Sequence, residues 1–335
     1  MIRVQSPTRV DLAGGTLDMW PLHAFVGEAL TINVAIDIYT EVDLTPRLDS
    51  SKIRITSEDL NFTADFDSLE QLLSSNVAQL KYYQMLAQFL KPSQGFEMTT
   101  RSMSPVGGGL GGSSSLLISM LKAFSLMSKK SLGSVKDLAW LGHNLEASLL
   151  RTPTGTQDYI PAIAGGVNFI RYSMTGVEIK TQDPEPFWED HFLLVYTGRS
   201  HHSGLNNFEV LKSAVKGDSE VLGALHKIAL LSRDLAEALT KKEWDRLPLL
   251  FAREYQARIQ LTEAFSSPEI RRLQDLALSF GLPGVKICGA GGGGCVLIWC
   301  ESRTQKKQIE DQCRQEGFHP LRAKPVRKHN LEEPL

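Results

Sequence analysis

The sequence predicts an α+β protein built from two domains. The chain has 335 residues, and at roughly 150 residues per domain this length corresponds to two domains. Strand-like and helix-like segments alternate along it, which is typical of helices packed on sheets in each half. A stretch with two prolines and several carboxylates, residues 181–190 (TQDPEPFWED), separates the halves. We therefore expect domains at residues 1–180 and 190–330.

The first half contains β-branched runs and stretches of helical periodicity. Residues 30–42 (LTINVAIDIYTEV) are rich in β-branched side chains and predict a strand, and the shorter runs 62–66 and 95–101 predict two more. Apolar residues recur at helical spacing over 69–90 and over 113–127, where serines precede the apolar run. These patterns predict two helices.

The second half begins with an apolar strand and continues with helices. The expected strands are 191–196 (HFLLVY), 286–288, 295–300 (CVLIWC) and 320–326. The expected helical regions are 206–262, 270–280 and 303–316.

Composition narrows the class of protein. The apolar fraction is 42% and the charged fraction 22%, which excludes wholesale disorder. A formal net charge of -2 gives no support to a nucleic-acid or anionic-membrane partner. The four cysteines form no C-x-x-C pair, so neither a structural zinc site nor a disulfide framework is expected. The start, MIRVQSPTRVDL, lacks the apolar core of a signal peptide, and no apolar run reaches about 18 residues. We expect a cytoplasmic protein, and its oligomeric state is left open.

A glycine-rich loop precedes the helix expected at 113–127. Residues 104–116 read SPVGGGLGGSSSL. Glycines let the backbone approach a ligand closely, and the free N–H groups of the following helix favour phosphate. No lysine follows the glycines, so the loop differs from G-x-x-x-x-G-K-[ST], and the dinucleotide-binding context is missing too. The loop is interpreted as a phosphate site, and a flexible turn is the structural alternative.

Three further segments hold candidate functional residues. Residues 286–296 (KICGAGGGGCV) suit either close approach of the backbone to a ligand or a hairpin turn. In residues 6–18 (SPTRVDLAGGTLD), Arg9 suits phosphate and Asp18 suits substrate hydroxyls, the alternatives being a surface ion pair and a turn residue. Glu146 and Asp158 suit a metal ligand and a general base, the alternative being two solvated acids.

Taken together, these segments resemble the GHMP kinase superfamily, which includes galactokinase, homoserine kinase, mevalonate kinase and phosphomevalonate kinase. The first family motif resembles SPTRVDLAGGTLD. The second, P-x-G-x-G-L-G-S-S-A, resembles residues 105–115, and the third, a lysine followed by G-A-G-x-G-G, resembles residues 286–294. Three motifs in the family's order form a specific signal. The resemblance implies an N-terminal domain like ribosomal protein S5 domain 2 and a ferredoxin-like C-terminal domain.

The resemblance also implies roles for individual residues. Arg9 and Asp158 would be catalytic, and Ser113 and Glu146 would hold magnesium (Mg2+). Gly112 stands where the family has its first serine, so the magnesium-facing hydroxyl comes from Ser113 or Ser114. Substrate would contact Gly15, Thr16, Asp18, Arg199 and Gly291. ATP would lie over Pro105, Gly107, Gly108, Gly109, Leu110, Gly111, Gly112, Ser113, Ser114 and Ser115.

Two other stretches resemble one branch of the superfamily. The run GTQDYIPAIAGGVNFI is similar to the D-glycero-D-manno-heptose 7-phosphate kinase branch, which includes fucokinase-like sugar kinases. In YTGRSHHSG, Arg199, His201 and His202 would bind a substrate phosphate, the alternative being a solvated loop.

The expected activity is ATP-dependent phosphorylation of a hydroxyl on a sugar or sugar phosphate. The favoured substrate is a heptose 7-phosphate phosphorylated at its anomeric hydroxyl. The alternatives are a mevalonate-pathway kinase, a galactokinase-like enzyme, an ATP-consuming decarboxylase and a catalytically silent sugar sensor on the same fold.

Overall fold

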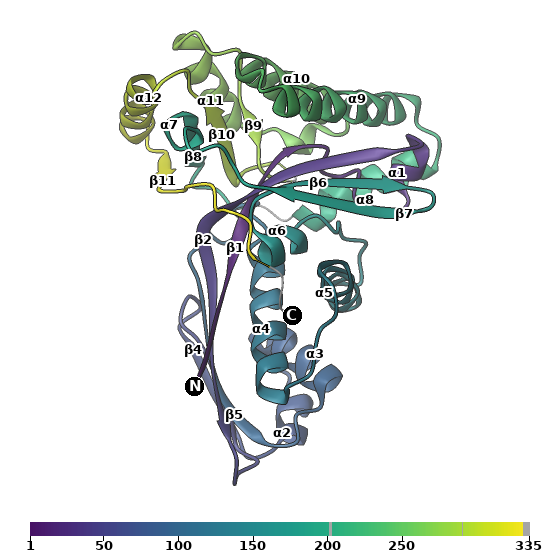
Figure 1. The fold of residues 1–335 in the computed structure, drawn as a ribbon, viewed down its shortest axis with the longest axis vertical. Coiled ribbons are helices and arrows are strands. Elements are labelled where there is room, and N and C mark those ends of the chain that lie inside the picture. The colour runs from purple at the N-terminus through teal and green to yellow at the C-terminus, as the bar shows by residue number, and fades with distance from the viewer. Residues whose placement is uncertain (201–202, 290, 331–335) are drawn as a thin grey trace.

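The computed structural model describes residues 1–200, 203–289 and 291–330. Helices and strands form two sheets with helices packed on them, so the prediction of an α+β protein is confirmed. Figure 1 shows α2–α5 gathered in the lower part of the molecule and α9–α12 in the upper part. No helix within the described ranges is long and apolar enough to cross a membrane.

The first sheet has seven strands and is organised around β2. Its order is β4-β3-β5-β2-β6-β7, with β1 paired to β2. All pairs are antiparallel except β3 with β5. Because β2 has 19 residues, it pairs with β1 along most of its length and with β5 and β6 at its two ends. The strands are β1 (Ile2–Ala13), β2 (Ala29–Arg47), β3 (Ile53–Ser57), β4 (Phe62–Phe66), β5 (Gly95–Ser102), β6 (Val167–Ser173) and β7 (Gly176–Gln182).

Helices pack on this sheet, and α4 makes the most extensive contact with β1 and β2. Its side chains Leu117, Ile118 and Leu121 are fully buried in the core that α4 shares with α5, α6, β1 and β2. The helix α5 begins at a capping box in which Ser134 and Asp137 each bond the other's backbone N–H. The elements are α1 (Leu22–Phe25), α2 (Leu69–Ser74), η1 (Ala78–Leu80), α3 (Lys81–Leu90), α4 (Gly112–Ser128), α5 (Val135–Leu150) and α6 (Tyr159–Ala164).

The second sheet is antiparallel, with the order β11-β8-β10-β9. All five residues of β10 are buried, which explains its uninterrupted apolar sequence. The strands are β8 (Phe192–Tyr196), β9 (Lys286–Ile287), β10 (Cys295–Trp299) and β11 (His319–Leu321). The helices are α7 (Trp188–His191), α8 (Ser203–Val215), α9 (Ser219–Lys241), η2 (Trp244–Arg246), α10 (Leu247–Ile259), η3 (Glu263–Phe265), α11 (Pro268–Ser279) and α12 (Arg303–Gln315).

Most predicted elements are present, and three predictions need correction. The helix expected at 69–90 is wrong as one element, because Ser75 ends α2 with an extended backbone (ψ 138°). The region 206–262 is likewise divided between α8, α9 and α10, and the last strand ends at Leu321. The strand β1 was not predicted. Between the sheets, β7 ends at Gln182 and α7 begins at Trp188. The domain limits 1–180 and 190–330 stay a prediction.

The segment after β11 returns from the second sheet to the first. Val326 N–H donates to Ala35 O at 2.8 Å, and His329 N–H donates to Ala164 O at 2.7 Å. The ring of His329 also contacts Ile163 O at 2.9 Å through Nδ1. Figure 1 shows this segment, in yellow, crossing to α6. It therefore satisfies carbonyl groups at the carboxyl end of α6, which have no partner within that helix.

Replacement of His329 by alanine tests this contact. A carbonyl only accepts hydrogen bonds, so Nδ1 of His329 is the donor, and its loss leaves Ile163 O without that partner. We expect H329A to lower the free energy of unfolding by about 1 kcal/mol, measured by thermal and urea unfolding. H226A is the matched control, since His226 is exposed on α9. Equal losses in the two variants would contradict a capping role.

Candidate active site

A cavity of about 380 Å³ lies where the two halves of the chain meet. This volume is within the range that binds small molecules. Its wall combines β1, the glycine loop that precedes α4, the start of α4, the end of α5, the turn before α6, and single side chains from α8 and α10. The site residues predicted from the sequence that line it are Arg9, Gly15, Thr16, Asp18, Pro105, Gly107, Gly108, Gly109, Leu110, Gly111, Gly112, Ser113, Ser114, Glu146 and Asp158.

Three predicted site residues lie elsewhere. Ser115 is fully buried, and its hydroxyl donates to Ser6 O at 3.0 Å. The side chain of Arg199 is 58% exposed, and its Nη1 lies 3.5 Å from Glu269 Oε2. Arg199 is not one of the described residues that line the cavity. An added Cβ at Gly291 would lie 2.2 Å from Phe265 O, so this glycine permits a close approach between backbone segments. Their ligand roles stay predictions, and His201 and His202 lie outside the described residues.

The first glycine loop, residues 105–111, ends at the amino end of α4. Gly111 has φ +70°, which side-chain-bearing residues rarely adopt, and it precedes the first helical residue, Gly112. An added Cβ at Gly111 would lie 3.3 Å from the carboxyl group of Asp158. The free N–H groups of α4 and the acid of Asp158 therefore face the same part of the cavity. An N–H-lined helix start of this kind favours a phosphate group.

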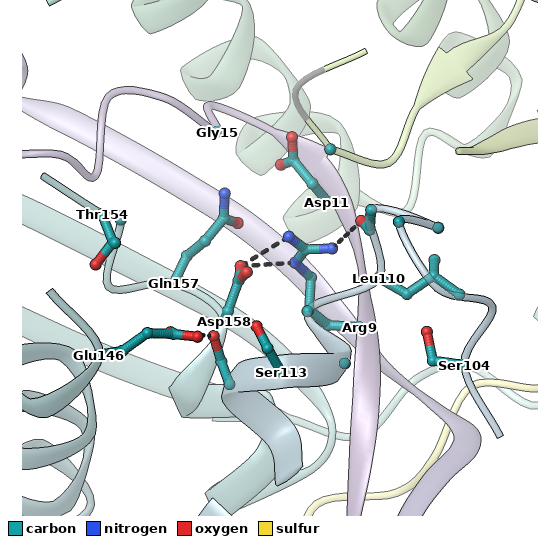
Figure 2. Close-up of a pocket in the computed structure, with 18 of the residues that line it drawn as sticks. Arg9, Asp11, Gly15, Ser104, Leu110, Ser113, Glu146, Thr154, Gln157 and Asp158 are labelled. Carbon is teal, nitrogen blue, oxygen red and sulfur yellow. Dashed lines mark hydrogen bonds and ion pairs between the residues drawn. The ribbon is translucent and has the colours of Figure 1, made fainter. Parts of the chain in front are cut away.

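Arg9 joins this loop to two other segments. Its Nε donates to Asp158 Oδ1 at 2.9 Å, and its Nη2 lies 2.8 Å from the same oxygen. Its Nη1 donates to Gly109 O in the first glycine loop. It also donates, at 3.0 Å, to Cys288 O, which directly precedes the second glycine-rich segment of the sequence. Figure 2 shows Arg9 between Asp158 and the first glycine loop. Because Arg9 is only 5% exposed, these contacts are largely shielded from water.

The carboxyl group of Asp158 has the environment of a proton acceptor. Burial raises its pKa above the ordinary value, and the positive charge of Arg9 opposes this shift only in part. A raised pKa makes a carboxylate a better base near neutral pH. Asp158 also immediately precedes α6, so the turn before this helix fixes its position.

Glu146 reaches the start of α4 from α5. Its carboxylate accepts hydrogen bonds from Tyr82 at 2.6 Å, from Ser114 at 2.9 Å and from Tyr159. Figure 2 shows it directed toward Ser113 and its neighbours. Ser113 is exposed to the cavity, whereas the hydroxyl of Ser114 is already bonded to Glu146.

The oxygens of Ser113 and Glu146 are the hard ligands that magnesium prefers. Within the described ranges, no group of three or more His, Cys, Asp or Glu side chains could hold a metal ion. A magnesium ion commonly keeps several waters and binds one or two carboxylates together with substrate phosphates. This donor set therefore fits magnesium carried with a nucleotide rather than an ion held by protein ligands alone.

Four buried charged side chains form a network at the cavity wall. Asp11 on β1 accepts hydrogen bonds from Lys286 at 3.0 Å and from Arg258 at 3.1 Å. Glu254 pairs with the same two cations. All four side chains are at most 2% exposed. Burial opposes ionisation of Asp11, but Lys286 and Arg258 together hold its pKa below the ordinary value. The two halves of the chain are thus joined by a charge-balanced buried network.

Asp18 lines the cavity from the turn that follows β1. Its Oδ2 accepts a hydrogen bond from Gln157 N at 3.1 Å. Burial raises the pKa of Asp18 to about 6, and the nearby negative charge of Asp158 adds to this shift. Asp18 can thus accept a hydrogen bond when ionised and donate one when protonated.

Several residues that line the cavity were not predicted, including Asp11, Gln157, Asn207 and Arg258. The period of two along a strand places Asp11 on the same face as Arg9. This relation can be used only when the segment is recognised as a strand, and β1 was not predicted. Gln157 adjoins Asp158 in the sequence. Asn207 and Arg258 lie on long helices outside every motif, and only the folded chain brings them to the cavity.

The sequence matches two family models. Residues 77–166 match the model described as GHMP kinases N terminal domain, and residues 235–319 match GHMP kinases C terminal. The D-glycero-alpha-D-manno-heptose 7-phosphate kinase of Campylobacter jejuni is 28% identical over 326 residues, covering 95% of this chain and 94% of that protein. The mevalonate kinase of Methanocaldococcus jannaschii is 26% identical, covering 92% and 95%.

Solved structures resemble the whole chain. A D-glycero-D-manno-heptose 1-phosphate kinase from Bacteriodes thetaiotaomicron superposes with a TM-score of 0.77 at 21% identity, covering 98% of this chain and 97% of that one. A mevalonate kinase gives 0.75 at 22% identity, covering 98% and 100%. At these identities the likeness concerns the fold, and the predicted two-domain fold is confirmed.

The pKa of Asp18 predicts a pH-dependent stability. A folded-state pKa of about 6 exceeds the value near 4 of an unfolded aspartate. The stability contributed by the protonated acid is therefore complete below about pH 4 and is lost as the pH rises through 6. Because asparagine cannot ionise, we expect D18N to be more stable than the parent by about 1–3 kcal/mol at pH 7.5 and to show no such gain at pH 4.

Denaturant unfolding at the two pH values measures this difference. D275N is the matched control, since Asp275 is exposed on α11. A gain for D18N that is the same at both pH values would contradict the raised pKa.

Proposed function

Because the chain belongs to the GHMP kinase family, whose members use ATP, we propose that it phosphorylates a hydroxyl group of a sugar or sugar phosphate. The observation that carries this proposal is the position of Asp158 against the amino end of α4, beside the first glycine loop. A phosphate donor and a proton acceptor can then meet at one point of the cavity.

In the proposed reaction, the N–H groups at the start of α4 and in the loop hold the triphosphate. Asp158 takes the proton of the acceptor hydroxyl as the hydroxyl oxygen attacks the γ-phosphorus. The bond from the γ-phosphorus to the β–γ bridging oxygen breaks, and ADP leaves with that electron pair. Arg9 positions Asp158 through Nε and Nη2 and offsets negative charge near the transferred group.

Ser113 and Glu146 are the residues that would hold magnesium. Bound there with ATP, the ion would supply positive charge that offsets the negative charge of the phosphates. The three hydroxyl groups that donate to Glu146 keep its carboxylate at the start of α4.

The acceptor is proposed to be a sugar phosphate, with a heptose 7-phosphate phosphorylated at its anomeric hydroxyl as the favoured case. The similarity to the Campylobacter jejuni heptose 7-phosphate kinase over 95% of the chain supports this choice. Asp18, which lines the cavity, can pair with a sugar hydroxyl. A mevalonate kinase activity is the second candidate, because a mevalonate kinase of Methanocaldococcus jannaschii is 26% identical over 92% of the chain.

Release of ADP from ATP and magnesium distinguishes these substrates. The acceptor panel contains a heptose 7-phosphate, galactose, fucose and mevalonate, each assayed at equal concentration. We expect the largest kcat/KM with the heptose phosphate. ADP release with mevalonate and with none of the sugars would contradict the sugar proposal and favour a mevalonate kinase. No release above the rate without acceptor, from any member, would contradict a kinase and favour a silent sensor.

Removal of the proton acceptor tests the mechanism. We expect D158N to lower kcat by about 10²–10⁴, because the amide cannot take the hydroxyl proton. Binding of ATP, followed by titration of a fluorescent analogue, should persist, since the loop is unaltered. D49N serves as the matched control, because Asp49 is exposed in the turn between β2 and β3. A kcat for D158N equal to that of the parent would remove Asp158 from the reaction.

A further inference from the structure

The helix α8 contributes one side chain, Asn207, to the cavity wall, beside the turn after β1. Asn207 lines the cavity together with Gly15, Thr16 and Asp18, which belong to the turn after β1. No motif contains Asn207, and the proposed phosphoryl transfer does not use it. Its amide oxygen is nevertheless the last acceptor in a short series of hydrogen bonds.

These hydrogen bonds form a chain from α10 through the turn to α8. Arg258 Nη1 donates to Thr16 Oγ1 at 3.2 Å, and Thr16 Oγ1 donates to Asn207 Oδ1 at 3.2 Å. A guanidinium group only donates, so Thr16 accepts from Arg258 and has its single hydrogen left for Asn207. With Oδ1 of Asn207 accepting this hydrogen, its Nδ2 group is left to donate elsewhere. Among the described residues, none accepts a hydrogen bond from Asn207 Nδ2.

Arg258, where this series of hydrogen bonds begins, is held in place by buried partners. Arg258 is 1% exposed and donates to Glu254 through Nε at 3.0 Å and to Asp11 through Nη2 at 3.1 Å. Thr16, which accepts from it, has φ +80°, a conformation that is rare for a β-branched residue. Backbone strain of this kind persists only where the surroundings hold it. The buried guanidinium supplies such a constraint.

We propose that Asn207 selects the acceptor substrate by donating from Nδ2 to a neutral hydroxyl of the sugar, and that Thr16 and Arg258 are positioning residues for this amide. This inference rests on the proposed function. Asp18 and Asn207 then offer an acceptor and a donor at one end of the cavity. Adjacent hydroxyl groups, as in a polyol or sugar, match both.

Steady-state kinetics on the full-length protein tests the role of the amide, with the best sugar acceptor of the panel as the probe. We expect N207A to raise KM for the sugar about 10-fold, because one hydrogen bond to substrate is lost. KM for ATP and kcat should stay within about 2-fold. N206A is the matched control, since Asn206 is the adjacent residue and its Nδ2 donates to Ala264 O at 3.3 Å. An unchanged KM for the sugar in N207A would overturn the proposal.

A charged replacement identifies the group that Asn207 contacts. A hydroxyl can donate as well as accept, so N207D should keep KM for the sugar within about 10-fold of the parent. If the amide instead contacted an anionic oxygen of a phosphate, N207D would repel it and lose 100-fold or more. That result would overturn the assignment to a neutral hydroxyl.

The positioning role is tested by an isosteric pair at Thr16. T16V lacks the hydroxyl and should raise KM for the sugar as N207A does, whereas T16S should recover most of that loss. The double variant T16V/N207A should be no worse than either single variant, because the two residues act in one chain. Fully additive losses would contradict the chain. R258K keeps the charge but cannot reach Asp11, Glu254 and Thr16 together, and it should reproduce the T16V effect.

Two measurements separate this inference from the proposed function. If the parent protein releases no ADP with any sugar, the proposed function fails. Calorimetric titration of the heptose 7-phosphate into the parent and N207A then still measures the contribution of the amide to binding, and equal affinities would overturn the inference. Thermal unfolding of each variant shows whether the fold is retained, and an altered KM counts only for variants that keep the parent's unfolding temperature to within about 3 °C.

Discussion

One buried guanidinium, that of Arg9, connects the parts of the site. It joins β1 to Asp158 before α6, to Gly109 in the first glycine loop and to Cys288 beside the second. Asp158, Gly109 and Cys288 lie 149, 100 and 279 residues from Arg9 in the sequence. The side chain of Arg9 is itself almost fully buried, so it depends on these acceptors. Breaking a buried ion pair costs about 3–5 kcal/mol when one partner is removed. The relative positions of the phosphate-binding loop and the proton acceptor therefore depend on this side chain.

The buried network of Asp11, Glu254, Arg258 and Lys286 likewise connects distant segments beside the cavity. Asp11 lies two residues from Arg9 on the same face of β1, and it binds Lys286 and Arg258 from the second half of the chain. Replacement of such a network by apolar side chains is often neutral or stabilising, so stability alone is a weak reason for it. Fixed geometry is a better one. Arg9 holds Asp158 and the first glycine loop in place. Arg258 holds the turn that contains Thr16 and Asp18.

The sequence predicted the parts of the site that depend on local chemistry. Glycines before a helix pointed to the first glycine loop, and two acids near a turn pointed to Glu146 and Asp158. All of these line the cavity. It could not predict Asn207 or Arg258, because their positions depend on how α8 and α10 pack against β1. The single helix expected at 69–90 failed for a related reason, since apolar periodicity continues through Ser75 although the backbone turns there. β1 was not recognised because its polar residues, such as Asp11, are buried by partners from distant segments.

A crystal structure with a non-hydrolysable ATP analogue, magnesium and a heptose 7-phosphate tests the central claim most directly. The account predicts the triphosphate against the N–H groups at the start of α4. It also predicts an acceptor hydroxyl within about 3 Å of a carboxylate oxygen of Asp158, in line with the γ-phosphorus. A nucleotide bound elsewhere, for example in the groove lined by Leu30, Phe169 and Thr240, or an acceptor hydroxyl remote from Asp158, would contradict phosphoryl transfer at this site.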